Sequence, residues 1–196
     1  EASIDFDITK YDEIDIVACG SAYHAGLVGK YMIEKLCNIK VNVCIASEYQ
    51  YDKHFYKGKT LVIAISQSGE TADTKKCVNI ANDMGVDTLG IVNVKGSSIA
   101  RICKHVIYTL AGPEIAMATT KAYLAQITTL ILLAVKNSKE KINTEDLQKL
   151  PYYIETLINK DYTFLANMLY TKDDIYFIGR GIDYALCMEG SLKLKE

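Results

Sequence analysis

The stretch LVIAISQSGETADT, residues 61–74, contains the junction that decides the fold. Its apolar run, residues 61–65, lies between Gly58 and Ser66, and its length suits a buried strand better than a helix. A polar turn follows, and apolar residues then recur at helical spacing from Ala72 to Met84. The stretch therefore predicts a strand that leads through a polar turn into a helix.

The same alternation continues on both sides of this junction. Strands are predicted near residues 14–19, 41–46, 61–66, 88–93 and 105–110, and helices near residues 22–37, 71–84, after Ser97 and over 115–136. Strands that alternate with helices form a parallel sheet covered by helices on both faces. We therefore expect an α/β fold, a three-layer αβα sandwich around a five-stranded parallel sheet.

Composition excludes several classes of protein. The chain has 196 residues, 49% of them hydrophobic and 23% charged, with a formal net charge of -2 and scattered lysines, so no nucleic-acid partner is expected. The longest apolar run, near residues 131–135, is too short to span a bilayer, and no signal-peptide pattern is present, so we expect a cytoplasmic protein without a membrane partner. The six cysteines form no C-x-x-C pair and the three histidines lie far apart, so we expect core packing and no metal site.

The alternation of strands and helices stops after residue 136. Residues 137–147 are polar, and helical patterns near 147–159 and 162–170 lead to a new strand at 174–179. DIVACGSAYHAG at 15–26 resembles DIYFIGRGIDYA at 174–185, which suggests a second unit of the same kind. We therefore expect a first domain over residues 1–140, a helical linker over 141–172, and the start of a second, truncated domain over 173–196.

The polar turn after residue 65 suits an anion. Ligands of parallel sheets bind at the carboxyl ends of strands, where helix N-termini carry unpaired N–H groups. Four side chains of the turn can donate hydrogen bonds, namely Ser66, Gln67, Ser68 and Thr71, and Gly69 allows the backbone to approach a ligand closely. This combination fits a phosphate better than an ordinary helix cap. A similar turn follows the first strand at residues 19–23, and because no dinucleotide or P-loop spacing occurs, we expect a sugar phosphate rather than a nucleotide.

Five motifs in a fixed order carry a family resemblance. They are ACGSAYHAG (18–26), SQSGETADT (66–74), NVKGSS (93–98), GPEIAMATTKAY (112–123) and EGSLKLKE (189–196). Because of these motifs, the chain resembles the isomerase half of the glutamine:fructose-6-phosphate aminotransferase family, also called glucosamine-6-phosphate synthases. The resemblance extends from about residue 9 to residue 196. That half is built from two sugar isomerase (SIS) domains, so the resemblance implies an SIS-type sandwich.

The resemblance also assigns roles to the polar turns. Ser66, Gln67, Ser68 and Thr71 match residues that hold the sugar phosphate, and Ser21 matches a threonine beside it. Ala22 stands where the family commonly has a serine, so one hydroxyl contact is lost. The segment Met117-Ala118-Thr119 matches one that lines the sugar, with Met117 in place of the usual valine and Thr119 in place of serine.

The last helical segment carries the catalytic expectation. Glu189, Lys193 and Glu196 are spaced four and three apart, so they share one helix face. Spacing alone favours a solvated charged stripe. The resemblance instead implies that Glu196 moves a proton between C1 and C2 of the open-chain sugar, that Lys193 assists it, and that Glu189 is a supporting acid.

The resemblance further implies partners. These are fructose 6-phosphate or glucosamine 6-phosphate, a glutaminase domain in the same parent chain and a second copy in a homodimer, with no cofactor. The chain begins Glu1-Ala2-Ser3 rather than with the glutaminase cysteine, so we expect a fragment without synthase activity of its own.

Two other functions stay open. An SIS sugar-phosphate sensor of a transcriptional regulator would carry a helix-turn-helix, and no basic helical segment precedes Ile14. A stand-alone SIS isomerase or deaminase is a further alternative. The helical linker and the repeat of the 15–26 pattern at residues 174–185 argue against it.

Overall fold

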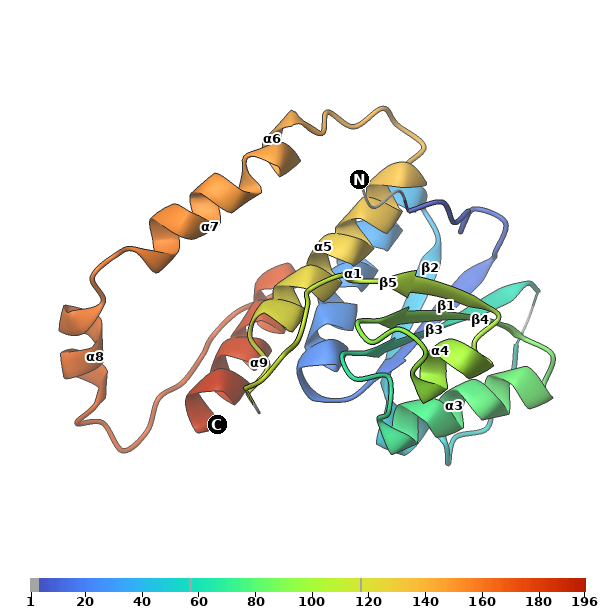
Figure 1. Ribbon diagram of the computed structural model, residues 1–196, viewed down its shortest axis with the longest axis horizontal. Helices are drawn as coiled ribbons and strands as arrows, with labels where there is room; N and C mark the ends of the chain where they lie inside the picture. Colours follow the sequence, from blue (N-terminus) through green and yellow to red (C-terminus); the bar gives the residue numbers. More distant parts are fainter. Residues whose placement is uncertain (1–3, 57, 117) are drawn as a thin grey trace.

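A five-stranded parallel sheet lies at the centre of the computed structural model, which describes residues 4–56, 58–116 and 118–196. The strands are β1 (Glu13–Ala18), β2 (Lys40–Ile45), β3 (Thr60–Ser66), β4 (Asp87–Val92) and β5 (His105–Tyr108). They are ordered β2-β1-β3-β4-β5, and each pairs in parallel with its neighbours (Figure 1). The expected five-stranded parallel sheet is confirmed.

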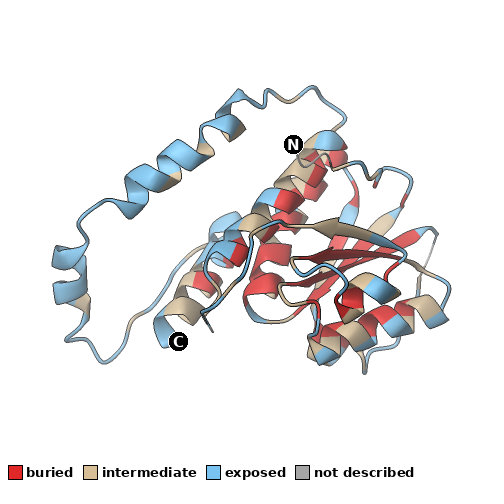
Figure 2. Ribbon diagram, viewed as in Figure 1, coloured by how far each residue is buried: buried red, intermediate tan, exposed pale blue. Residues whose placement is uncertain are grey.

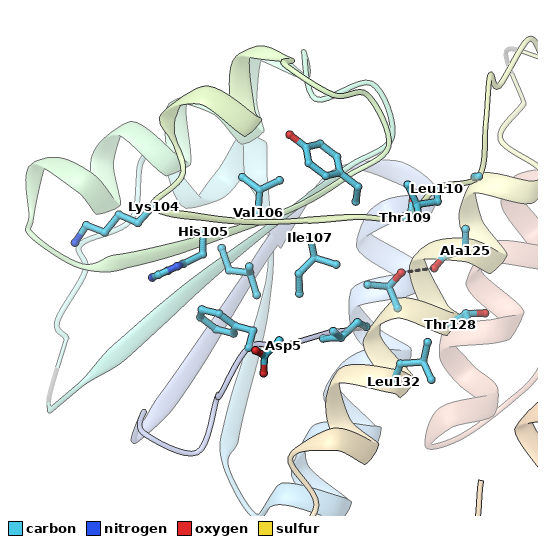
Figure 3. A pocket seen from close by; sticks show the side chains of 16 residues that line it. Asp5, Lys104, His105, Val106, Ile107, Thr109, Leu110, Ala125, Thr128 and Leu132 are labelled. Atoms are coloured by element: carbon cyan, nitrogen blue, oxygen red, sulfur yellow. Dashed lines mark hydrogen bonds between the residues drawn. The ribbon is translucent and has the colours of Figure 1, made fainter. Parts of the chain in front are cut away.

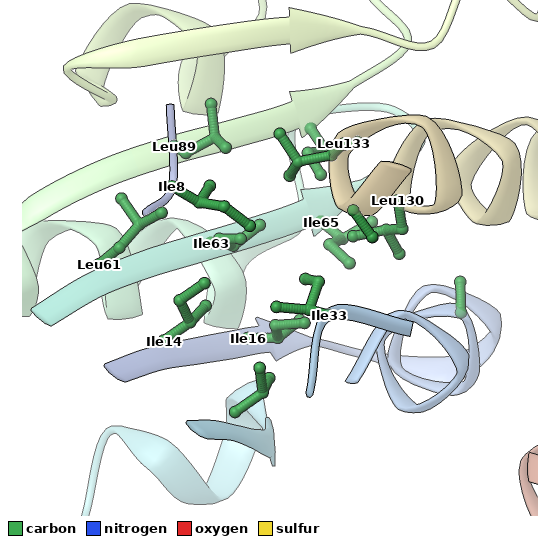
Figure 4. Close-up of a cluster of buried hydrophobic side chains, with 14 of the residues drawn as sticks. Ile8, Ile14, Ile16, Ile33, Leu61, Ile63, Ile65, Leu89, Leu130 and Leu133 are labelled. Carbon is green, nitrogen blue, oxygen red and sulfur yellow. The ribbon is translucent and has the colours of Figure 1, made fainter. Parts of the chain in front are cut away.

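Helices cover both faces of this sheet. One layer consists of α1 (Gly20–Cys37) and α5 (Lys121–Lys136), and the other of α2 (Ala46–Tyr49), α3 (Ala72–Asp83) and α4 (Ser98–Ile102). Because successive side chains of a strand point to opposite faces, β3 contributes to two separate cores. Its Ile63 packs toward α1 and α5 (Figure 4), whereas Val62 packs toward α3. The three-layer αβα sandwich is confirmed.

The remaining helices lie apart from this sandwich. They are α6 (Glu145–Gln148), α7 (Leu150–Ile158) and α8 (Thr163–Leu169), and none of them contains a buried residue (Figure 2). The chain then returns, and α9 (Ile182–Lys195) packs against α1 (Figure 1). No described helix is both long and apolar enough to cross a membrane.

Two predicted helices have different bounds. The helix expected over 115–136 begins only at Lys121, where the Glu114 carboxylate accepts the backbone N–H of Ala122 at 3.0 Å in the first turn. The helix expected over 147–159 is divided into α6 and α7, and Pro151 sits in the first turn of α7. Proline lacks the N–H that a helix interior needs, so a new helix begins there.

The strand predicted at 174–179 is wrong for the described chain. This segment pairs with no described strand, and its side chains Tyr176 and Ile178 are 82% and 90% exposed. A strand needs hydrogen bonds from a neighbour, and here the apolar pattern has no adjacent sheet to join. Only the helix that follows it, α9, forms as expected.

Candidate functional site

The strand order places a crevice at the carboxyl ends of β1 and β3. These two strands are neighbours, yet α1 leaves β1 toward one face of the sheet and α3 leaves β3 toward the other. Such a switch point opens a crevice between the two turns, where ligands of open α/β sheets bind. The two polar turns singled out in the sequence therefore meet.

A pocket of about 340 Å³ occupies this crevice. It brings together seven of the predicted site residues, namely Ser21, Ser66, Gln67, Ser68, Thr71, Thr119 and Glu196. Glu189 and Lys193 do not line it. Met117, also predicted, lies outside the described residues.

Internal hydrogen bonds fix the turn after β3. Ser66 Oγ accepts the backbone N–H of Gly69 at 3.0 Å, and Ser68 Oγ accepts that of Glu70 at 3.1 Å. Gly69 has a φ of +67°, and a Cβ there would lie 2.0 Å from Ser97 Oγ, so only glycine fits. These contacts hold the turn in its observed conformation.

The helices that leave the two turns keep free N-terminal donors. Neither Cys19, the N-cap of α1, nor Thr71, the N-cap of α3, makes a side-chain capping bond. The unpaired N–H groups and the partial positive charge of both helices are therefore available to an anion. Of the two residues in the capping alternative, Ser68 does accept a backbone N–H, that of Glu70, whereas Thr71 makes no capping bond.

The loop that carries Thr119 is held by Glu114. Its carboxylate accepts the N–H of Ala122 at 3.0 Å, the N–H of Thr120 at 3.2 Å and the hydroxyl of Thr120 at 3.0 Å. These bonds, led by the one from Ala122, hold the pKa of Glu114 below its ordinary value. Glu114 thus fastens Thr120, the residue after Thr119, to the start of α5 at Lys121.

The three acidic and basic residues of α9 form a chain of contacts. Lys193 Nζ lies 3.8 Å from Glu189 Oε1 and also pairs with Glu196. Glu196 lines the pocket, whereas Glu189 is 5% exposed and points toward α1, where its Oε2 lies 2.7 Å from His24 Nδ1. A solvated charged stripe, the interpretation that spacing favoured, is therefore wrong for Glu189.

Two residues of this region were missed by the sequence analysis. The sequence predicts only core packing for His24, although this residue lies three positions after Ser21 on α1 and so on the same side of that helix. Gln126 on α5 lines the pocket, is 2% exposed, and its Oε1 has no hydrogen-bond partner among the described residues. The signal for Gln126 was a lone amide in the apolar run of residues 122–135.

A larger pocket, of about 760 Å³, lies at the open edge of the sheet (Figure 3). It is bounded by β5, α5 and the segment of residues 4–6, and Ile107, Leu110 and Leu132 contribute apolar walls. No predicted site residue lines it, and none of its lining residues carries one of the buried, unpartnered polar atoms found in the described chain. The smaller switch-point pocket is the candidate site.

Comparisons with known proteins agree with this geometry. Residues 7–136 match the family model of the SIS domain. The glutamine–fructose-6-phosphate aminotransferase (isomerizing) of Clostridium tetani is 48% identical over 198 residues, which cover 95% of this chain and 33% of that protein. The corresponding enzyme of Clostridium acetobutylicum is 45% identical over 208 residues, covering 98% and 34%.

A solved structure has the same fold. The C-terminal domain of glucosamine-fructose-6-phosphate aminotransferase from Francisella tularensis matches with a TM-score of 0.84 and 33% identity, over 95% of this chain and 56% of that one. The chain spans about a third of the length of the two Clostridium relatives. Since the SIS match covers most of its residues, the chain belongs to the SIS domain family.

Proposed function

We propose that this chain is the sugar-phosphate-binding part of a glutamine–fructose-6-phosphate aminotransferase. The observation that carries the proposal is the switch-point pocket, in which side-chain donors, two uncapped helix N-termini and the Glu196 side chain converge. The identity of about 45% to enzymes of that name supports the assignment. The parent would convert fructose 6-phosphate and glutamine to glucosamine 6-phosphate and glutamate.

In this proposal the two ends of the sugar are held by different parts of the pocket. The phosphate binds at the turn formed by Ser66 to Thr71, with Ser21 beside it, because the donors there face a group that stays anionic. The C1–C2 end lies toward Glu196, whose carboxylate accepts and returns the transferred proton. Lys193 holds the Glu196 side chain, and Thr119 and Gln126 contact sugar hydroxyls.

The wider organisation is proposed on the same basis. Residues 1–140 form the first SIS domain, 141–172 the helical linker and 173–196 the start of a second SIS domain. Ammonia would come from a glutaminase domain of the parent chain, and no cofactor is needed for a proton shift. The homodimer and the cytoplasmic location stay predictions.

A sugar-phosphate sensor is the second candidate. It would need the phosphate turn but no proton-transfer group. The presence of Glu196 on the pocket wall, tied to Lys193, favours the enzyme over the sensor.

Titration calorimetry with fructose 6-phosphate tests the binding proposal. The Ser66→Ala/Ser68→Ala double variant should lower the affinity at least about tenfold, because hydrogen bonds to a charged group are each worth roughly 1.5–3 kcal/mol. A matched Ser47→Ala/Ser138→Ala variant, outside the pocket, should bind as the wild type does. Equal binding by wild type and the pocket variant would refute the proposed site.

A further inference from the structure

A buried polar contact joins α1 to α9. His24 and Glu189, 8% and 5% exposed, lie 165 positions apart in sequence, and Nδ1 of His24 is 2.7 Å from Oε2 of Glu189. An ionised carboxylate can only accept a hydrogen bond, so the Nδ1–H of His24 is the donor. The contact connects a helix that begins at one ligand turn with a helix that ends at the pocket wall.

Few apolar side chains of α9 are fully buried. Ala185 and Glu189 are its buried residues, and apolar side chains such as Leu186 and Leu194 are 48% and 55% exposed. A helix is usually set by an apolar stripe that packs into a neighbour, and α9 buries only one small apolar side chain. The contact of His24 with Glu189 is the buried polar contact found between α1 and α9 in the described chain, and it gives the register of α9 on α1 a specific anchor that the half-buried side chains Met188 and Leu192 do not supply.

The register of α9 determines where Glu196 lies. Glu196 follows Glu189 by one heptad, so the two side chains are about 20° apart around the helix and roughly 10 Å apart along it. A slip by one residue would turn the helix face by about 100° and move it about 1.5 Å, which breaks the contact with His24 and takes Glu196 off the pocket wall. Lys193, which contacts both carboxylates, links the two ends of this heptad.

His24, the other partner of the contact, lies close to the pocket on α1. His24 lies one turn after Ser21, which lines the pocket, so α1 carries a ligand-binding side chain and the anchor of α9 on one rigid helix. Displacement of a reacting group by about 1 Å is enough to cost about 10² in rate. A fixed distance between the phosphate turn and Glu196 therefore matters for proton transfer.

We infer that His24 is a positioning residue: through Glu189 it sets the register of α9 on α1 and thereby holds Glu196 at the pocket. The part of this inference that concerns Glu196 rests on the proposed function. The part that concerns the register of α9 does not, because it needs no ligand. The two parts call for separate measurements.

Hydrogen exchange of the chain without ligand tests the register. His24→Leu, which removes the donor but keeps the bulk, should raise the exchange rates of α9 amides about tenfold or more, since local opening follows lost local contacts. His24→Asn keeps an N–H near the Nδ1 position and should preserve protection. His105→Leu on β5, an exposed histidine, serves as the control and should leave α9 unchanged. Unchanged protection of α9 in His24→Leu would overturn the inference.

Steady-state isomerisation in the full-length protein tests the link to Glu196. His24→Leu should lower kcat about 10² while KM changes less than about threefold, because the phosphate contacts remain and only the base is displaced. His24→Asn should recover most of the lost kcat. A raised KM with unchanged kcat, or no rescue by asparagine, would show a merely structural role and overturn the inference.

The double variant His24→Leu/Glu189→Leu covers the case in which the single variant fails to fold. It removes both polar partners, so no unpaired carboxylate stays buried. We expect it to fold and still to lose kcat, and a kcat equal to that of the wild type would overturn the inference. If the wild type neither binds nor converts fructose 6-phosphate, the proposed function fails, whereas the exchange result on α9 stands or falls independently.

Discussion

The hydroxyl groups of Ser66 and Thr71 lie 2.9 Å apart and join the two ends of the turn after β3. Ser66 is the last residue of β3 and Thr71 the residue before α3, so the contact joins the strand to the helix that it feeds. The turn keeps its shape through this contact and through the bond from Gly69 N–H to Ser66. Each of these groups can be tested alone.

Thr71→Val should weaken binding of fructose 6-phosphate. Valine keeps the shape of threonine but removes the hydroxyl, and loss of one bond to a charged phosphate should lower affinity about tenfold or more. Thr156→Val, the same change on exposed α7, is the control and should bind normally. Calorimetry measures both, and full affinity in Thr71→Val would remove Thr71 from the site.

Gly69→Ala should damage both stability and binding. Gly69 and Gly85 both have positive φ, +67° and +74°, but an added Cβ meets Ser97 Oγ at 2.0 Å only at Gly69, while nothing lies within 4 Å at Gly85. Gly85→Ala should cost about 1–2 kcal/mol for the left-handed backbone alone. Gly69→Ala should cost roughly 1–3 kcal/mol more from the clash and lower ligand affinity. Urea unfolding gives the stability difference, and equal costs at the two positions would contradict the described turn.

Gln126→Met should separate stability from binding. The buried amide oxygen of Gln126 has no hydrogen-bond partner among the described residues, and an unsatisfied buried polar group costs about 1–3 kcal/mol. Methionine of similar size should therefore leave the free energy of unfolding unchanged or raise it, while fructose 6-phosphate binds more weakly. Thermal unfolding and calorimetry check the two effects. Undiminished affinity would show that the amide does not contact the sugar.

Glu196→Gln in the full-length parent should abolish isomerisation and leave binding nearly intact. The amide keeps the shape of the side chain but cannot accept the proton, and removal of a positioned base costs about 10² to 10⁴ in rate. Ser68→Ala should do the reverse, because phosphate contacts act equally in the ground and transition states. Solvent deuterium exchange into the sugar, measured beside equilibrium binding, compares them. Exchange at the wild-type rate in Glu196→Gln would exclude Glu196 as the base.

Asp15→Asn should stabilise the chain at neutral pH. Burial raises the pKa of Asp15 above its ordinary value of 3.8, although the bond from Asn42 Nδ2 to its Oδ1, 2.8 Å, opposes the shift. The folded state then favours the protonated acid, so ionisation costs stability as pH rises through the raised pKa. The gain from asparagine should be present at pH 7, shrink as pH falls and disappear below about pH 3.8.

Asp7→Asn is the control of opposite sign for Asp15. The hydroxyl and backbone bonds from Thr9 lower the pKa of Asp7, so its ionised form stabilises the fold above pH 3.8 and that contribution is lost as pH falls through the lowered pKa. Chemical unfolding across pH 3–7 compares the two variants. Parallel pH profiles of the two would contradict the assigned environments.

The sequence by itself determined what depends on local pattern. The apolar run of residues 61–65 and the polar turn after it were enough to predict a buried strand, a turn and a helix, and the repetition of this pattern gave the parallel sheet. The spacing of Glu189, Lys193 and Glu196 placed them on one helix face, and Lys193 does contact both carboxylates. Such features follow from the helical and strand periods, which a chain carries residue by residue.

The tertiary structure alone decided which distant residues meet. The start of α5 depends on the Glu114 carboxylate, and the apolar segment at 174–179 forms no strand because no neighbour pairs with it among the described residues. The burial of Gln126 at the pocket and the contact of His24 with Glu189 arise only when α5 and α9 pack near α1. These contacts join positions far apart in the chain. The periodicity of a single helix or strand cannot predict them, so they form only through the tertiary fold.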